Sequence, residues 1–324
     1  MPGQATAWRA ALGGRDDEAL VYNVCMLRIR ALQADDFAAA DDVLRAAFHN
    51  NISFVPRLRR YLALQPDGWL VADDEGQVVG MVGAIDYGPF AYVGLMAVRP
   101  DRQGQRLGRK LLDSLLAALD GRGTPCTLLD ASAAGAPLYE RSGFVDTGLS
   151  HEFSCTEESL PAGPAKARSD GATLPAAADS IQSQAPAVTV AGAADVDDIV
   201  ALDASFLGAP RERLWRWLFA THRILAARDG DGALAGYLCA QDPLLGPFGA
   251  REPAVAAGLI AAALQTLGHR NVRLQVPEEN AEGRALLASV GFRETRTLRH
   301  MRRGPFPTLA GWRSIYGKGS YCLG

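Results

Sequence analysis

The feature that most constrains this chain of 324 residues is an internal repeat, because the same order of expected helices and strands occurs twice along it. Aligning Gly143-Phe144 with Gly291-Phe292 gives an offset of 148 residues, and the same offset places Gln103 opposite Arg251 without a gap. Two anchors that agree on one offset indicate a duplication. We therefore expect two related domains of ordinary size.

A segment rich in Ala, Ser and Pro and lacking aromatic residues separates the two copies. Such a composition cannot bury a core, so it is expected to be a linker. The predicted organisation is an N-terminal extension without clear periodicity (1–25), an N-terminal domain (26–153), the linker (154–187) and a C-terminal domain (188–324).

Hydrophobic periodicity and turn residues predict an α+β order in each copy. In the first copy we expect strands at 27–31, 69–73, 77–86, 90–98, 126–131 and 148–154, and helices at 35–49, 54–64, 105–120 and 135–142. In the second copy we expect helices at 195–206, 211–220, 253–267 and 280–290, and strands at 223–228, 233–240, 272–276 and 296–303. Both lists describe an antiparallel meander followed by a helical crossover to a further strand.

Composition argues against several classes of protein. The net charge is −3 and the pI is near 6.0, so nucleic acid is not an expected partner. The five cysteines and five histidines are scattered without metal-ligand spacing, which predicts no metal and favours a reducing, cytoplasmic environment. No apolar run has the length of a membrane span, and the N-terminus lacks the apolar core of a signal peptide.

The stretch from Val98 to Leu112 carries the clearest chemical signal. An apolar strand ends at Pro100, a polar loop with Gly104 follows, and an amphipathic helix begins near Gly108. Such a loop directs the free N–H groups of a helix start, with the helix dipole behind them, at one point. A diphosphate fits this arrangement, helped by the charges of Arg102, Arg106 and Arg109. An ordinary strand-to-helix turn with solvated basic residues explains the same stretch of sequence equally well.

The loop resembles the acetyl-CoA pyrophosphate loop of the GNAT superfamily, whose pattern is Gln/Arg-x-x-Gly-x-Gly/Ala. Gln103 and Gly108 match this pattern, whereas Arg106 replaces the central glycine. We expect Arg106 to be tolerated with helical backbone angles at the helix start. The resemblance covers residues 26–153 and implies tandem GNAT folds, each a mixed, mostly antiparallel sheet flanked by helices.

A second match lies downstream, where Leu138-Tyr139 is followed by Gly143-Phe144. In the family this tyrosine points toward the thioester sulfur, and a phenol there can protonate the departing CoA thiolate. Packing of the ring between helix and sheet is an equally good explanation for Tyr139 taken alone. The resemblance further implies that Met96, Ala97 and Val98 pair with the pantetheine arm and that a backbone N–H near Met96 polarises the thioester. The implied cofactor-binding residues are Met96, Ala97, Val98, Gln103, Gly104, Gln105, Arg106, Leu107, Gly108 and Arg109.

Several roles remain open in the sequence. No glutamate occupies the strand position from which many relatives supply a general base, so water, Asp86, Tyr87 or Asp130 are the alternatives, with a strand-end cap the simpler explanation for Asp130. Candidates for the acceptor pocket, by position only, are His49, Asn50, Asn51 and Trp69.

The second copy keeps the order of helices and strands but not the functional residues. Pro253 stands where a backbone N–H donor is expected, and Leu287 stands where the tyrosine is expected. Its last residues resemble the C-terminal domain of certain tandem bacterial GNAT proteins. The expected activity is therefore acyl transfer from acetyl-CoA to the primary amine of a small molecule or amino acid derivative. A non-catalytic acyl-CoA-binding regulator and a protein-lysine acetyltransferase are the alternatives, and the sequence does not decide the oligomeric state.

Overall fold

The computed structural model describes residues 27–156, 187–268, 271–305 and 310–324. The expected extension at 1–25 and nearly all of the expected linker at 154–187 lie outside the described residues. The chain divides into two compact units, and neither is one continuous stretch. Unit 1 comprises the described residues up to Leu129, then Gly135–Val145 and Arg302–Pro305; unit 2 comprises Asp130–Ala134, Asp146–Met301 and Phe306–Gly324.

Unit 1 is built on a meander that continues into one parallel strand. Its strand order follows the sequence, and all neighbours are antiparallel except the last pair. The strands are β1 (Leu27–Ala31), β2 (Trp69–Asp74), β3 (Gln77–Asp86), β4 (Ala91–Val98) and β5 (Thr127–Ala131). The tight turn between β2 and β3 uses Glu75 and Gly76, both with positive φ, as a two-residue hairpin requires.

The helices of unit 1 bury apolar stripes against this sheet. They are α2 (Phe37–Phe48), α3 (Val55–Leu64), α4 (Leu107–Gly121) and α5 (Ala136–Glu140), with short 3-10 turns η1 (Ala34–Asp36) and η2 (Pro100–Arg102). Leu111, Leu112 and Leu115 of α4 are fully buried. Each such side chain contributes about 1.5–3 kcal/mol through burial, which fixes α4 on β3 and β4.

Unit 2 holds a second meander and three further neighbouring strands. The meander has the order β13-β10-β9-β8-β7, and the three further strands have the order β12-β6-β11. The strands are β6 (Val145–Cys155), β7 (Val188–Val190), β8 (Arg223–Arg228), β9 (Leu234–Ala240), β10 (Leu245–Ala250), β11 (Val272–Pro277), β12 (Arg293–Arg303) and β13 (Ile315–Gly317). The helices are α7 (Val196–Leu207), α8 (Glu212–Thr221), α9 (Pro253–Leu267) and α10 (Ala281–Ser289), with the turns η4 (Ala193–Asp195) and η5 (Ala310–Ser314).

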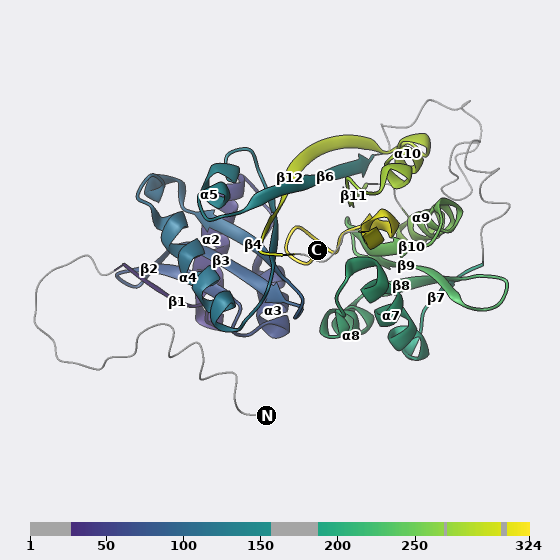
Figure 1. The fold of residues 1–324 in the computed structure, drawn as a ribbon, viewed down its shortest axis with the longest axis horizontal. Helices are drawn as coiled ribbons and strands as arrows, with labels where there is room; N and C mark the ends of the chain where they lie inside the picture. The colour runs from purple at the N-terminus through teal and green to yellow at the C-terminus, as the bar shows by residue number, and fades with distance from the viewer. Residues whose placement is uncertain (1–26, 157–186, 269–270, 306–309) are drawn as a thin grey trace, which may run out of the picture. The chain divides into compact units, whose positions relative to one another are not determined.

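The strand β6 is grouped with unit 2 although it follows α5 of unit 1 in the sequence. Figure 1 shows this teal strand beside the yellow-green β12, and it pairs with β11 from Cys155↔Val272 to Ser150↔Pro277. Phe153 and Cys155 are buried in the apolar cluster of unit 2, which explains the grouping. The sequence assigned 148–154 to the N-terminal domain, and the domain limits drawn there remain a prediction. The repeated α+β order of mostly antiparallel sheets and flanking helices is confirmed.

Candidate active site

A β-bulge interrupts β4 in the middle of unit 1. The pairing with β3 runs from Gly80↔Val98 and Met81↔Ala97 directly to Gly83↔Gly94, so two residues of β4, Leu95 and Met96, lie opposite one residue of β3. Leu95 has a left-handed φ of 52°, which is unusual for a residue with a side chain. A bulge bends the strand and takes a residue out of the ladder. The predicted oxyanion donor near Met96 therefore lies where β4 departs from regular pairing.

The other edge of β4 is paired over only a short distance. Its parallel register with β5 contains Ala91↔Thr127 and Tyr92↔Leu128. Since the bulge begins at Leu95, three residues after Tyr92, the two strands share their ladder only at its start within unit 1. The later part of β4, which includes Met96, Ala97 and Val98, is then the stretch along which an extended ligand can add its own amides.

The loop after β4 ends in a helix start that is suited to an anion. Gln103 closes it by donating from Nε2 to the carbonyl of Val98 at 3.1 Å. Gly104 has a φ of 76°, and the first helical bond of α4 runs from the N–H of Lys110 to the carbonyl of Arg106. The N–H groups of residues 106–109, in the turn before this bond, therefore have no acceptor within the helix. They are available to phosphate oxygens together with the dipole of this helix.

Arg106 does not have the helical backbone angles that the sequence predicted. Its φ of 61° and ψ of 14° are left-handed, so it takes the conformation that the glycine of the family pattern provides without strain. The expectation of helical angles was wrong because Arg106 is the N-cap residue, one position before α4 begins. The backbone strain of Arg106 therefore lies at the point where the loop turns into α4.

The three arginines of the loop differ in how far their charge is already neutralised. Arg102 pairs with Asp74 at 2.6 Å and Arg109 pairs with Asp113 at 2.8 Å. Arg106 is exposed, and its side chain makes no hydrogen bond or ion pair with the part of the chain that the structure describes. Arg106 is thus the loop cation that remains available to a diphosphate, whereas the sequence treated all three as equivalent.

Gly108 lies where α4, β4 and α5 come together. A Cβ built on it would lie 3.5 Å from Leu138 of α5 and 3.8 Å from Val98 of β4, which are ordinary contacts. A small residue is therefore sufficient here, in agreement with the Gly/Ala alternative of the family pattern. Gln105 and Leu107 complete the predicted loop; Gln105 accepts from Arg102 Nε at 3.2 Å, and Leu107 is buried.

Tyr139 is on α5 in the same unit as the loop. Its ring meets that of Phe144 edge to face with centroids 5.8 Å apart, and 8% of the residue is exposed. The turn after α5 returns the N–H of Phe144 to the carbonyl of Tyr139 at 3.1 Å. The structural and catalytic explanations for this tyrosine are thus compatible, because the packing holds the ring while a small part of the residue stays accessible.

The candidate bases occupy structural positions. Asp86 accepts from Thr124 Oγ1 at 2.7 Å and from the N–H of Gly88 at 2.9 Å, which stabilises the turn after β3. Asp130 has a fully buried side chain paired with Lys318 at 3.0 Å. Neither a free base nor a strand-end cap describes Asp130, because its carboxylate belongs to a buried ion pair. Lys318 was missed by sequence reasoning, since a single lysine in a C-terminal segment gives no signal of burial.

The acceptor candidates chosen by position have ordinary roles. Trp69 is 1% exposed, stacks on Tyr61 and donates to the Tyr61 carbonyl at 3.0 Å, so it is part of the core. His49 ends α2 in a left-handed conformation, and Asn50 accepts from the N–H of Ile52 at 2.8 Å in the turn that follows. These contacts give Trp69 and Asn50 structural roles that do not involve an acceptor, whereas His49 and Asn51 remain candidates by position.

Unit 2 repeats the frame with a much shorter connection. Residues 99–106 join β4 to α4 in unit 1, whereas only Arg251 and Glu252 join β10 to α9 in unit 2. The gap-free alignment of Gln103 with Arg251 therefore matches a long loop to a short turn. Pro253 opens α9 and Leu287 is fully buried, so neither a phosphate loop nor a phenol is present at the corresponding positions.

Membrane-spanning and metal-binding features were also searched for in the described ranges. No helix there is long and apolar enough to cross a bilayer. No group of three or more His, Cys, Asp or Glu side chains in those ranges is arranged to hold a metal ion.

Comparisons with known proteins agree on one family for both halves. Two family models, each described as an acetyltransferase (GNAT) domain, match residues 65–146 and 199–317. The chain is 28% identical over 222 residues to the uncharacterized N-acetyltransferase YitH of Bacillus subtilis, covering 67% of this chain and 71% of that protein. It is 36% identical over 87 residues to the mycothiol acetyltransferase of Streptomyces coelicolor, covering 25% and 28% of the two chains.

Solved structures extend the likeness of fold to nearly the whole chain. A Pyrococcus horikoshii protein assigned as an acetyltransferase aligns with a TM-score of 0.75 at 22% identity, over 96% of this chain and all of the other. A GCN5-related N-acetyltransferase from Sphaerobacter thermophilus aligns with a TM-score of 0.63 at 16% identity, over 88% and 98%. Together with the bulged strand, the glycine-bearing loop and the repeated frame, these matches show that the chain belongs to the GNAT family of acyl-CoA N-acyltransferases, as a member with two GNAT domains in tandem.

Proposed function

We propose that this enzyme transfers the acetyl group of acetyl-CoA to the primary amine of a small molecule or amino acid derivative, with unit 1 as the catalytic unit. The observation that carries the proposal is the joint presence in unit 1 of the bulge at Leu95 and the open helix start at Arg106. One accepts the extended arm of the cofactor and the other its diphosphate. The proposed location is the cytoplasm, where acetyl-CoA and a reducing environment occur together.

The reaction needs positioning and two proton movements. A neutral amine attacks the thioester carbonyl, the N–C bond forms, and the C–S bond breaks as the amine proton leaves to solvent. The bulge near Met96 offers a backbone N–H to the carbonyl oxygen as negative charge develops on it. Tyr139 gives its proton to the departing thiolate and regains one from solvent. Holding both reactants in this geometry supplies most of the acceleration.

The test is a screen of amine acceptors with detection of the CoA thiol that is released. Polyamines, amino acids, amino sugars and aralkylamines represent small acceptors, and lysine-containing peptides represent protein substrates. We expect turnover with a small amine and its loss in Tyr139→Phe. Binding of acetyl-CoA without release of thiol by any amine would instead support an acyl-CoA-binding regulator. Turnover confined to the peptides would support a protein-lysine acetyltransferase.

Background thiols should not interfere with this assay. Cys126, Cys155, Cys239 and Cys322 are all buried, and each is a thiol and not part of a disulfide. Burial raises the pKa of Cys126 to about 11, so its thiol stays protonated at neutral pH and reacts slowly. A blank with protein alone measures the contribution of the remaining residues.

A further inference from the structure

A short strand near the C-terminal end fills the space between two strands of unit 2. Within the described residues, β10 and β11 are bridged in parallel only next to the start of β10, at Leu244↔Arg273. Beyond this bridge β13 pairs with β10 through Phe248↔Gly317 and Gly249↔Ile315. On its other side β13 contacts β11, and the N–H of Lys318 donates to the carbonyl of Gln275 at 2.8 Å.

This place in unit 2 corresponds to the ligand slot of unit 1. Both β4 and β10 precede the long helix of their unit, and both β5 and β11 follow it. The chain fits tightly, since a Cβ on Gly317 would lie 2.5 Å from the carbonyl oxygen of Leu245, and one on Gly246 would lie 2.3 Å from that of Lys318. An extended ligand could enter here only by displacing β13.

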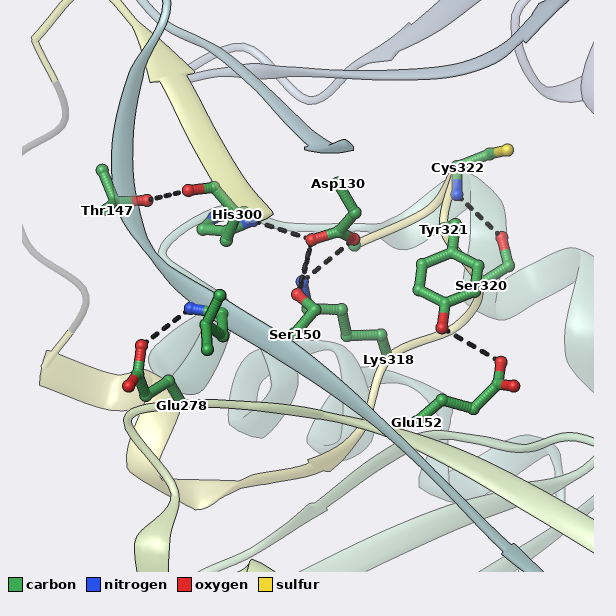
Figure 2. Close-up of polar contacts among 12 residues, drawn as sticks. Asp130, Thr147, Ser150, Glu152, Glu278, His300, Lys318, Ser320, Tyr321 and Cys322 are labelled. Atoms are coloured by element: carbon green, nitrogen blue, oxygen red, sulfur yellow. Dashed lines mark hydrogen bonds and ion pairs between the residues drawn. The ribbon is translucent and has the colours of Figure 1, made fainter. Parts of the chain in front are cut away.

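The segment of residues 315–318, which fills the space between β10 and β11, places Lys318 in a buried polar cluster. Its ammonium lies 3.0 and 3.1 Å from the two carboxylate oxygens of Asp130 and 2.6 Å from Ser150 Oγ. Figure 2 shows Asp130 between Lys318 and His300, whose Nδ1 lies 3.0 Å from the same carboxylate. The ring of Trp312 covers the ammonium at 5.1 Å from its centroid.

The electrostatics of the cluster favour a charged Asp130. Burial by itself raises the pKa of Asp130, but the Lys318 charge and the His300 hydrogen bond outweigh it and hold this pKa well below its ordinary value. Burial lowers the pKa of Lys318, and Asp130 opposes that shift. Two ions without water contact are stabilised only by good mutual geometry and additional hydrogen bonds, which Ser150 and His300 supply.

Asp130 is also part of β5, the strand that forms one side of the slot in unit 1. Thr127 and Leu128 of the same strand pair with β4, and Asp130 follows two residues later. Because residues 315–318 fill the space between β10 and β11, we infer that they have replaced a cofactor in unit 2. Because Asp130 is covalently continuous with the rest of β5, Lys318 and Asp130 are then positioning residues that hold β5 for the reaction in unit 1. The inference rests on the proposed function, because the strand held is the one beside the proposed cofactor slot.

The test removes both charges together, because Lys318→Met alone would leave a buried carboxylate without its partner and destabilise the fold. The variant is Asp130→Asn/Lys318→Met. The control is Arg30→Met/Asp73→Asn, which removes a partly buried ion pair between β1 and β2 in unit 1 together with the contact of Arg30 to Asp36. Urea unfolding first establishes that both variants are folded under assay conditions.

We expect the test variant to lose about ten-fold to a hundred-fold in kcat with an acetyl-CoA KM within about two-fold of wild type, since a shift of about 1 Å in the reacting geometry has an effect of that size. The control should keep both parameters. A purely structural pair would leave kcat of the folded test variant unchanged, and that result would overturn the inference.

Amide hydrogen exchange gives a readout that does not depend on turnover. The amides of residues 127–131 should lose protection in the test variant and keep it in the control. If wild type turns over no amine, the proposed function fails while this measurement still decides whether the pair holds β5. Unchanged protection of these amides in the test variant would also refute the positioning role, whatever the value of kcat.

Discussion

Arg106 offers a way to separate backbone strain from charge at the cofactor loop. A residue with a side chain in the left-handed region costs about 1–2 kcal/mol relative to its ordinary conformation. Glycine relieves this cost but adds about 0.4–1 kcal/mol of unfolded-state entropy. Because Arg106 has a φ of 61° and its side chain has no partner among the described residues, Arg106→Gly should stabilise unit 1 by about 0.5–1 kcal/mol. A gain of this size corresponds to a rise in Tm of about 1–4 °C.

The same substitution should weaken cofactor binding. An exposed charge close to a diphosphate accounts for roughly a five-fold change in affinity. Arg106→Gln is the matched control, since it removes the charge and keeps the strained side chain. We expect both variants to bind acetyl-CoA about five-fold more weakly by calorimetry, and only Arg106→Gly to gain stability in urea unfolding. If Arg106→Gly is less stable than Arg106→Gln, the argument from strain is wrong; if both bind like wild type at low salt, the loop does not hold the diphosphate.

Four further outcomes follow from the structure. Tyr139→Phe should lower kcat by about ten-fold to a thousand-fold with unchanged acetyl-CoA binding, and an unchanged rate of a chemically limited step would remove the phenol from the mechanism. Gly104→Pro should weaken acetyl-CoA binding by roughly ten-fold in calorimetry, because its φ of 76° is inaccessible to proline; wild-type affinity would show that the loop is misassigned. Titration should saturate at one acetyl-CoA per chain, since residues 251–252 are too short for a phosphate loop; two equivalents would show that unit 2 also binds. Burial, and after it the Lys318 charge, lower the pKa of His300 from 6.5, so the unfolded state binds more protons and the free energy of unfolding falls as pH drops below about 6.5. In urea unfolding between pH 7 and 5, His300→Gln should lose less free energy of unfolding than wild type. An equal loss would contradict this.

The sequence predicted the elements well because apolar periodicity and turn residues are local signals. The helix over 253–267 and the strand over 27–31 agree with the structure to the residue. The loop at 103–108 was placed at the start of α4 for the same reason, since glycine and proline mark the ends of elements. The duplication was also visible, because repeated order survives where individual residues do not.

Only the tertiary structure decided what depends on contacts between distant residues. The pairing of β6 with β11 was invisible, because a strand records which of its faces is apolar but not which strand it will join. The left-handed backbone of Arg106 was predicted wrongly, since the shift of the helix start by one residue changes the required angles. Lys318 gave no local sign of its role, because a buried lysine is distinguished only by the carboxylate that meets it 188 residues away. The sequence by itself therefore determined the family, the elements and the loop, while the fold decided which charges are free to bind a ligand and which are already paired.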